Sequence, residues 1–293
     1  MSLPVICLAS AKSCGVTTAA LALTFASARP SLLAECDPAG GTIRAGLLQS
    51  QVSAGYGLYH LAAAERVGQV ELANAFTSHL WPLDGPNGHR KVLPGLTDPA
   101  QAAALSRTWP ALSDVLHVMS ESVGHDVFVD AGRLALESGH LHPTLTPAPL
   151  LHKADLVLLA VRGTEQGLTL ARHLIRSLRT ELEEHGSGAD AVGLLLIEEG
   201  TFRSHQVAEA LEAPVLAALP WDPDTAAYLN VGGKPPRGFD RTPLLRSART
   251  AADQFEAIVS RRRIQQQYSS PAGAHPQLAG VLDQLAAPGG PRG

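Results

Sequence analysis

The first forty residues constrain the fold most, because they alternate two apolar runs with a short loop and a helical segment. Residues 3–9 are almost continuously apolar, and a second apolar run covers 31–36. The loop 10–16 and a segment of small and apolar residues, 17–28, lie between these runs. Continuous apolar runs of this length are typical of parallel strands that are covered on both faces. The sequence therefore predicts a right-handed strand–loop–helix–strand unit.

Further apolar runs follow along the chain, and most of them are separated by segments with helical spacing. Together with 3–9 and 31–36, strands are expected at 91–95, 126–130, 155–161, 192–197 and 215–219. Helices are expected at 17–28, 55–64, 67–80, 98–105, 112–122, 166–185, 204–211 and 242–263, with a loop or short helix at 143–151. This alternation predicts one α/β domain over 1–263, with a doubly wound, mostly parallel sheet flanked by helices in a Rossmann-like, three-layer arrangement.

Residues 264–293 have a different composition, dominated by Gln, Ser, Pro, Gly and Ala, which predicts a disordered tail. Within the tail, Leu278, Val281, Leu282 and Leu285 keep helical spacing. A helix that docks on a partner is therefore an alternative for this part of the chain.

Composition excludes several classes of protein. The net charge of −4 gives no general basis for nucleic-acid binding, so any such binding needs a local basic patch. Three cysteines, Cys7, Cys14 and Cys36, are too few and too clustered for a disulfide framework or a metal knuckle. No stretch approaches the ~18 apolar residues of a membrane-spanning helix, and the N-terminus lacks the pattern of a secretion signal. We expect a cytoplasmic protein without a transmembrane segment.

The loop after the first strand has the position of a phosphate-binding loop and part of its pattern. When G-x-x-x-x-G-K-[S/T] is aligned on Gly15, Ser10 takes the place of the first glycine and Val16 that of the lysine. Thr17 then takes the place of the hydroxyl that ligates Mg²⁺. A strand leading through a loop into a helix directs backbone N–H groups toward an anion. By itself, this pattern fits an ordinary strand-to-helix turn equally well.

Two acidic residues favour the nucleotide interpretation. Asp37 and Asp130 each lie at the end of a predicted buried strand. Ligands of open α/β sheets bind beyond the carboxyl ends of the strands, so both acids are expected to face the same crevice as the loop. Two carboxylates and the hydroxyl of Thr17 around one point suit Mg²⁺ with a nucleotide. A dehydrogenase-like dinucleotide site is disfavoured, because no G-x-G-x-x-G follows the first strand.

Over residues 3–260 the chain resembles the MinD/ParA group of P-loop ATPases, also called the deviant-Walker group. The resemblance rests on SAKSCGVTTAALALTFA (10–26), LLAECDPAGG (32–41), DVFVDAGRL (126–134), ADLVLLAVRGT (154–164) and LEAPVLAALPWDP (211–223). It implies a P-loop fold that binds ATP and Mg²⁺, forms a dimer and positions a protein cargo or machine. Septum-site, chromosome-partitioning and pilus-localisation proteins are the related branches.

The resemblance also implies roles for individual residues of the loop. Ser13, Cys14, Gly15, Val16, Thr17 and Thr18 would contact the phosphates. Thr17 would ligate Mg²⁺, and Thr18 would lie near the α-phosphate. Lys12 would approximate the signature lysine, which reaches the partner's phosphates in the family.

Three acidic residues and the loop that contains Pro220 and Asp222 complete the implied site. Glu35 and Asp37 would form the pair that polarises the attacking water, with Asp37 also near the metal. Asp130 would match the Walker B acid and ligate Mg²⁺. Pro220 and Asp222 lie where the family contacts the nucleoside.

The chain departs from the family pattern at the lysines. Val16 removes the lysine that would hold the β- and γ-phosphates, and Lys12 is one residue closer to Gly15 than the signature lysine. Loss of a cation that stabilises transition-state charge costs about 10³–10⁵ in rate for a missing arginine finger. We therefore expect slow or absent hydrolysis, unless Lys12 or a partner supplies the charge.

Two functions remain open from the sequence. The first is an ATP-binding dimeric switch, and the second is a non-hydrolysing pseudo-ATPase scaffold of a pilus or secretion assembly. Basic residues at Arg172, Arg176 and Arg179, and at 261–263, leave open either non-specific DNA binding or an ordinary solvated helix face.

Overall fold

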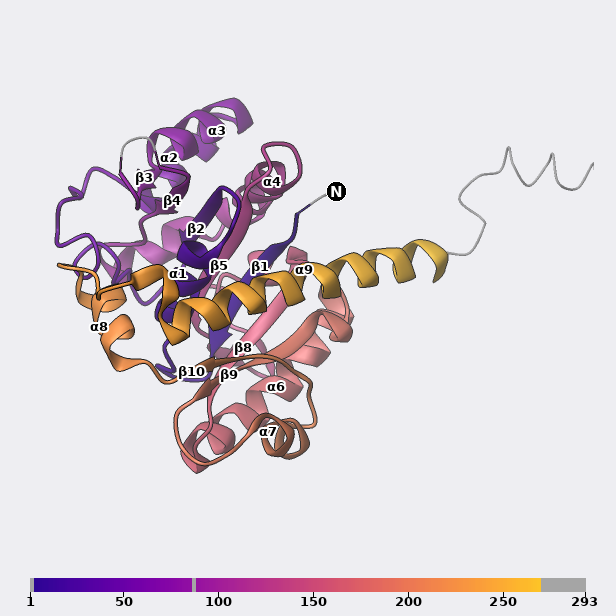
Figure 1. The fold of residues 1–293 in the computed structure, drawn as a ribbon. Helices are drawn as coiled ribbons and strands as arrows, with labels where there is room; N and C mark the ends of the chain where they lie inside the picture. The colour runs from indigo at the N-terminus through magenta and orange to yellow at the C-terminus, as the bar shows by residue number, and fades with distance from the viewer. Residues whose placement is uncertain (1–2, 86–87, 270–293) are drawn as a thin grey trace, which may run out of the picture. The chain divides into compact units, whose positions relative to one another are not determined.

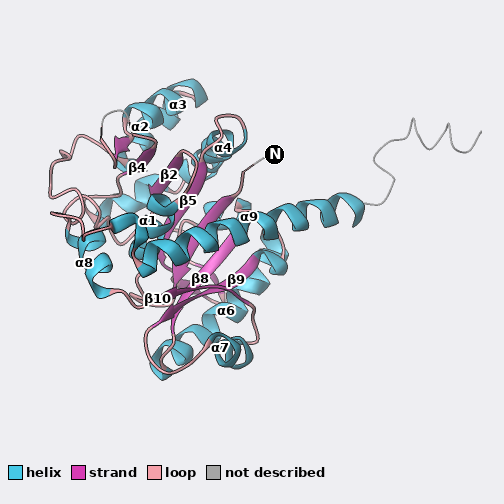
Figure 2. Cartoon of the chain, viewed as in Figure 1, coloured by secondary structure: helices cyan, strands magenta, loops and turns pink. Residues whose placement is uncertain are grey.

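The computed structural model describes residues 3–85 and 88–269, and one eight-stranded sheet dominates them (Figures 1 and 2). Across the sheet the strands are β10 (Val215–Pro220), β9 (Val192–Glu198), β8 (Leu156–Arg162), β1 (Val5–Ser10), β5 (Asp126–Arg133), β2 (Ser31–Glu35), β4 (Arg90–Leu93) and β3 (Trp81–Pro82). Neighbouring strands are parallel, except that β3 pairs antiparallel with β4. The predicted doubly wound, mostly parallel sheet is confirmed, with each of the seven expected strands present.

The strands that the sequence failed to predict are two residues long. One is β3 at the sheet edge, and the others, β6 (Leu136–Glu137) and β7 (His140–Leu141), form a separate antiparallel hairpin after β5. Two-residue strands contain too few positions to give a period-2 pattern, so hydrophobic periodicity does not detect them.

The helices agree with prediction in order and differ mainly at their ends. They are α1 (Val16–Ala26), α2 (Leu61–Val67), α3 (Gln69–Ser78), α4 (Thr108–Glu121), α5 (Ala148–Lys153), α6 (Glu165–His185), α7 (Ser204–Leu211), α8 (Pro223–Val231) and α9 (Pro243–Ser269). Short 3₁₀ segments occupy η1 (Leu58–His60), η2 (Pro99–Leu105), η3 (Ala189–Ala191) and η4 (Phe239–Arg241). Helix α8 was not predicted, and 98–105 forms a 3₁₀ helix rather than an α-helix.

Alternate residues of the central strand contribute to two apolar layers. Val5, Cys7 and Ala9 of β1 belong to a large buried cluster with residues of α4, α6 and α7. On the other face of the sheet, α1 packs against β1, β2 and β5, and Figure 1 shows it in front of these strands. The start of α9 is buried through Leu245, and Arg249 Nε donates to the carbonyl of Ala26 at the end of α1 (3.2 Å). A helix–sheet–helix architecture results.

The chain divides into two compact units, Met1–Glu256 and Ala257–Gly293. The first contains the sheet and all helices up to the beginning of α9. Helix α9 continues to Ser269, past the expected helix end at 263 and into the segment for which disorder was predicted. The remainder of the predicted tail, including Leu278, Val281, Leu282 and Leu285, lies outside the described residues. Among the residues that the structure describes, none of the helices is both long and apolar enough to span a membrane.

Candidate functional site

The switch in strand order places one loop at the centre of the sheet's carboxyl edge. β1 lies between β5 and β8, so the chain leaves β1 in one direction and later returns on its other side. Residues 11–15 follow β1 at this point and lead directly into α1. Crevices at such switch points are where open α/β sheets bind their ligands.

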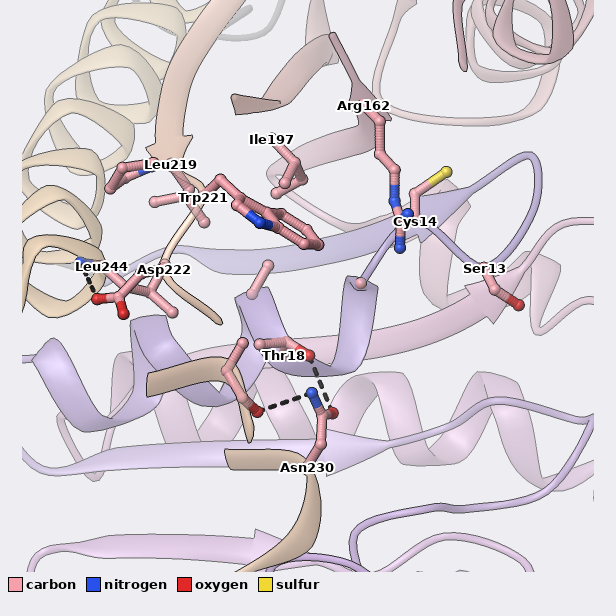
Figure 3. A pocket seen from close by; sticks show the side chains of 14 residues that line it. Ser13, Cys14, Thr18, Arg162, Ile197, Leu219, Trp221, Asp222, Asn230 and Leu244 are labelled. Atoms are coloured by element: carbon pink, nitrogen blue, oxygen red, sulfur yellow. Dashed lines mark hydrogen bonds between the residues drawn. The ribbon is translucent and has the colours of Figure 1, made fainter. Parts of the chain in front are cut away.

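A cavity of about 250 Å³ lies beside this loop (Figure 3). Its walls come from the loop and the first turn of α1, from the ends of β8, β9 and β10, and from α8 and the start of α9. The lining residues are Ser13, Cys14, Gly15, Thr18, Ala19, Arg162, Ile197, Leu219, Pro220, Trp221, Asp222, Ala226, Asn230 and Leu244. The predicted site residues Ser13, Cys14, Gly15, Thr18, Pro220 and Asp222 therefore share one cavity.

The backbone of the loop presents amides without partners. Gly15 is the N-cap of α1 and has φ +87°, a left-handed conformation that glycine adopts without steric cost. A Cβ there would meet no atom within 4 Å, so the loop is open above Gly15. The first helical bond is donated by Ala19 N to Gly15 O (2.9 Å), and within the described chain no bond is donated by the amides of 13–18. These amides and the positive end of α1 are suited to bind an anion.

Thr17 and Asp130 meet on the other side of the first turn of α1. Thr17 Oγ1 donates to Asp130 Oδ2 at 2.5 Å, although 113 positions separate the two residues. Asp130 is completely buried within β5 and also accepts a bond from Gly132 N (2.9 Å). Burial, with the nearby charges of Glu35 and Asp37, raises the pKa of Asp130 to about 7, against the opposing bond from Thr17. No lysine or arginine of the described residues forms an ion pair with this carboxyl group.

Asp37 lies beside the end of β5. A Cβ built on Gly132 would be 2.0 Å from Asp37 Cγ, so the carboxyl group of Asp37 occupies the space above this glycine. Gly132 has φ +66°, and Asp37 Oδ1 accepts a bond from Ala39 N (2.8 Å). Burial raises the pKa of Asp37, while Arg133 lowers it. The three predicted metal ligands, Thr17, Asp37 and Asp130, are thus grouped, and two acids with a hydroxyl suit Mg²⁺.

Glu35, for which a catalytic role is predicted, is held by backbone amides of two loops. Its side chain is buried, and its two oxygens accept bonds from the amides of Thr42 (2.6 Å), Ile43 (2.9 Å) and Gly95 (2.7 Å). Burial raises the pKa of Glu35, whereas these bonds oppose that rise. The carboxylate connects the loop after β2 to the loop after β4, which is an anchoring arrangement. Its predicted role in activating water stays a prediction.

The cavity wall opposite α1 consists of α8 and the segment before it. Asp222 caps α8 by accepting bonds from Thr225 N (3.2 Å) and Thr225 Oγ1 (2.8 Å), so its carboxylate is already engaged. Thr18 Oγ1 donates to Asn230 Oδ1 at the end of α8 (3.0 Å; Figure 3). Because Asn230 lies 212 residues after Thr18, sequence spacing gave no signal for this contact. The contact fixes α8 against the phosphate-binding end of α1.

Arg162 is the principal cavity residue that the sequence analysis missed. It ends β8, forms an ion pair with Glu199 (2.8 Å) and places its guanidinium 5.6 Å from the ring centroid of Trp221. Figure 3 shows its side chain directed toward Cys14 of the loop. Its buried Nε has no hydrogen-bond partner among the described residues. The signal in the sequence was an arginine at the carboxyl end of a predicted strand.

The remaining loop side chains are placed as follows. Val16 is buried, with 6% of its surface exposed, and so packs as an apolar residue where the Walker pattern has lysine. Lys12 is exposed and does not line the cavity. Cys7, Cys14 and Cys36 are all buried free thiols, and burial raises the pKa of Cys14 although Arg162 opposes this. The loop thiol is therefore protonated near neutral pH.

Comparison with known proteins identifies the architecture. No protein-family model and no curated protein sequence matches the chain. Solved structures do match, with low identity and nearly complete coverage. The cell division ATPase MinD from Pyrococcus furiosus superposes with a TM-score of 0.62 at 17% identity, over 87% of this chain and 100% of that one. The chain has the MinD/ParA fold.

Other matching structures support the same assignment of fold. The septum site-determining protein MinD from Pyrococcus horikoshii OT3, complexed with Mg-ADP, gives a TM-score of 0.60 at 14% identity, over 88% and 98% of the two chains. A ParA family ATPase from Chlorobium tepidum gives 0.59 at 16%, over 85% and 98%. The expected P-loop α/β fold class is thus confirmed, whereas identities this low leave activity to be inferred from the site.

Proposed function

We propose that the chain is a nucleotide-dependent switch of the MinD/ParA type, which binds ATP with Mg²⁺ as a dimer and positions a protein cargo. The observation that carries this proposal is the loop 13–18, whose unpartnered amides lie between the cavity and the Thr17–Asp130 pair. Phosphates on these amides would extend from the cavity to the acids. The MinD fold neighbour complexed with Mg-ADP supports a nucleotide of this class.

The two sides of the loop suit different parts of the ligand. Thr17, Asp130 and Asp37 would hold Mg²⁺, which neutralises phosphate charge when bound. On the other side, Trp221 and Pro220 would contact the nucleoside, and Thr18 would lie close to the phosphates with its hydroxyl held by Asn230. Asp222 would support the nucleoside site indirectly by holding the start of α8, because its carboxylate is used in the cap of that helix.

Slow hydrolysis is part of the proposal. Val16 is apolar and buried, and Lys12 is exposed, so neither supplies a cation inside the cavity. Arg162 is the cation that does line it, and its unpartnered Nε suits it to a phosphate oxygen. We assign to Arg162 part of the charge neutralisation that the missing lysine would provide. Because Glu199 and Trp221 hold its guanidinium in place, Arg162 would favour nucleotide binding over nucleotide hydrolysis.

A pseudo-ATPase scaffold is the second candidate function, and the apolar Val16 is the observation that favours it. Measured ATP hydrolysis clearly above that of Thr17→Ala and Asp37→Ala variants would exclude the scaffold. DNA binding is a weaker candidate, because two of the three arginines on α6 contact residue 212. Arg176 Nη2 lies 3.5 Å from Glu212 Oε1, and Arg179 Nη1 donates to Glu212 O (2.9 Å).

Equilibrium titration with a fluorescent ATP analogue, with and without Mg²⁺, tests the proposal when combined with light scattering for mass. We expect saturable binding that Mg²⁺ strengthens and a doubling of mass in the bound state. Asp130→Asn should abolish the Mg²⁺ effect, and Arg162→Gln should weaken binding with Mg²⁺ dependence retained. Glu209→Gln, an exposed residue of α7, is a control that should bind as the wild type does. Absence of saturable binding in the wild type would refute the proposed function.

A further inference from the structure

A cluster of histidines and one glutamate lies outside the cavity and the acid group. Glu181 and His185 occupy one face of α6 at i, i+4 spacing, and His140 belongs to β7. One potential ligand atom from each of these three residues lies within 4.8 Å of the other two. His152 of α5 adds a fourth imidazole, with Nε2 2.9 Å from Glu181 Oε1. Three histidines from three separate elements therefore converge on one carboxylate.

Glu181 carries a buried carboxylate that is surrounded by three imidazoles. Its side chain is only 7% exposed, and its oxygens face His140 Nδ1 (3.1 Å), His152 Nε2 (2.9 Å) and His185 Nδ1 (3.8 Å). The backbone amide of Leu141 donates a further bond to Glu181 Oε2 (3.4 Å). No lysine or arginine within the described ranges pairs with this carboxylate. A buried carboxylate without a paired cation is costly. A metal ion held by the same nitrogen and oxygen atoms would supply that charge.

We infer that His140, Glu181 and His185 form a binding site for a divalent transition metal, with Zn²⁺ as the fitting ion. Tetrahedral Zn²⁺ with ligands at ~2.0–2.1 Å places ligand atoms about 3.3 Å apart. His140 Nδ1 lies 3.1 Å from Glu181 Oε2, close to this value, and His185 Nδ1 lies 3.8 Å from the other oxygen, Oε1. A small rotation of the carboxylate and of the His185 ring would bring one atom from each residue around a single ion. His140 and His185 are 58% and 51% exposed, so both rings are free to rotate into final geometry.

His152 and the adjacent hollow complete the site. His152 contacts the same carboxylate oxygen as His185 and thereby orients Glu181, as residues behind a metal ligand commonly do. A hollow of about 660 Å³, lined in part by His152 and His185, borders the cluster and leaves room for water as the fourth ligand. The bound ion would join the β6–β7 hairpin to α6. Since the hairpin follows β5 directly, the ion would stabilise the segment just after Asp130 and Gly132.

Metal titration of the tag-free full-length protein tests the inference, with Zn²⁺ in competition with a chromophoric chelator and Mg²⁺ present throughout. The wild type should bind one equivalent of Zn²⁺ with a dissociation constant of order 1 μM or tighter. A His140→Ala/His185→Ala double variant should bind at least about tenfold more weakly. His173→Ala removes an exposed histidine from the same helix and should leave the affinity unchanged.

Two further readouts separate a metal site from a purely structural ion-pair cluster. Co²⁺ should give the visible bands of tetrahedral coordination in the wild type and in His173→Ala, and lose them in the double variant. Zn²⁺ should raise the melting temperature of the wild type but not of the double variant. In EDTA the double variant should melt somewhat below the wild type, because the buried carboxylate of Glu181 loses its contact with His140, but Zn²⁺ should not change that temperature. Equal Zn²⁺ affinity in the double variant, or no stoichiometric binding by the wild type, would overturn the inference.

Discussion

Replacement of Glu35 by glutamine separates an anchoring role of this residue from a catalytic one. The carboxylate accepts three backbone bonds, from Thr42, Ile43 and Gly95, and is 1% exposed. Glutamine keeps one acceptor oxygen and replaces the other by an NH₂ group. In the wild type, Thr42 and Ile43 both donate to Oε1 of Glu35, and Gly95 donates to Oε2. If the oxygen of the glutamine amide takes the place of Oε1, its NH₂ group faces the N–H of Gly95. One charge-assisted bond is then lost, and two buried donors, the N–H of Gly95 and the new NH₂ group, are left without partners.

The free-energy cost follows from this count. A hydrogen bond to a charged group contributes about 1.5–3 kcal/mol, and an unsatisfied buried donor costs about 1–3 kcal/mol. Removal of the charge also relieves repulsion with Asp37 and Asp130, which offsets part of the loss. We expect Glu35→Gln to lower the free energy of unfolding by about 2–3 kcal/mol. The melting temperature should fall by roughly 4–12 °C for a chain of this size.

Urea unfolding followed by tryptophan fluorescence and circular dichroism measures this loss. Glu209→Gln makes the same chemical change at an exposed site, and its free energy of unfolding should stay within about 0.5 kcal/mol of the wild-type value. A Glu35→Gln protein that is as stable as the wild type, but has lost ATP turnover, would refute the anchoring role and favour water activation.

Three further changes test separate parts of the site. Val16→Lys should bind ATP more tightly or hydrolyse it faster, whereas Val16→Met, similar in length but uncharged, should do neither; no effect of the lysine would mean that the loop does not align with the Walker pattern. Trp221→Ala should weaken ATP binding by about 1–3 kcal/mol through lost stacking, with Mg²⁺ dependence intact, and unchanged affinity would place the base elsewhere. Asp130 has a folded-state pKa of about 7, above the value of about 3.9 for an unfolded chain. Its protonation therefore stabilises the fold at low pH, and this stability is lost as the pH rises from about 4 through about 7. In EDTA, the stability of the wild type relative to Asp130→Asn should fall over that range, and a flat difference would contradict the buried, cation-free carboxylate.

The sheet was predictable because its parallel strands are buried on both faces. The runs 5–9 and 156–161, which make up most of β1 and β8, are continuously apolar, a pattern that needs no tertiary information. Helix α8 was missed although Asp222 and Pro223 give an N-cap and first-turn signal, because its face toward the protein is short and weakly periodic. The Asp-Pro pair alone would have indicated a helix start.

The candidate site was predictable where it depends on position along the strands. Thr17 lies in the first turn of the helix after β1, and Asp130 lies in the carboxyl half of the neighbouring strand β5, so the order of elements brings both to the same edge of the sheet. Arg162 and Asn230 were not predictable, because their part in the cavity depends on which strands and helices become neighbours in space. The anchoring contacts of Glu35 likewise come from two loops that only the folded sheet brings together.

A crystal structure with Mg²⁺ and a non-hydrolysable ATP analogue tests the central claim most directly. We predict phosphate oxygens within hydrogen-bond distance of the amides of 13–18, Mg²⁺ beside Thr17 and Asp130, and the base against Trp221. An analogue bound elsewhere, or a loop whose amides are closed off by the protein's own side chains, would contradict the account.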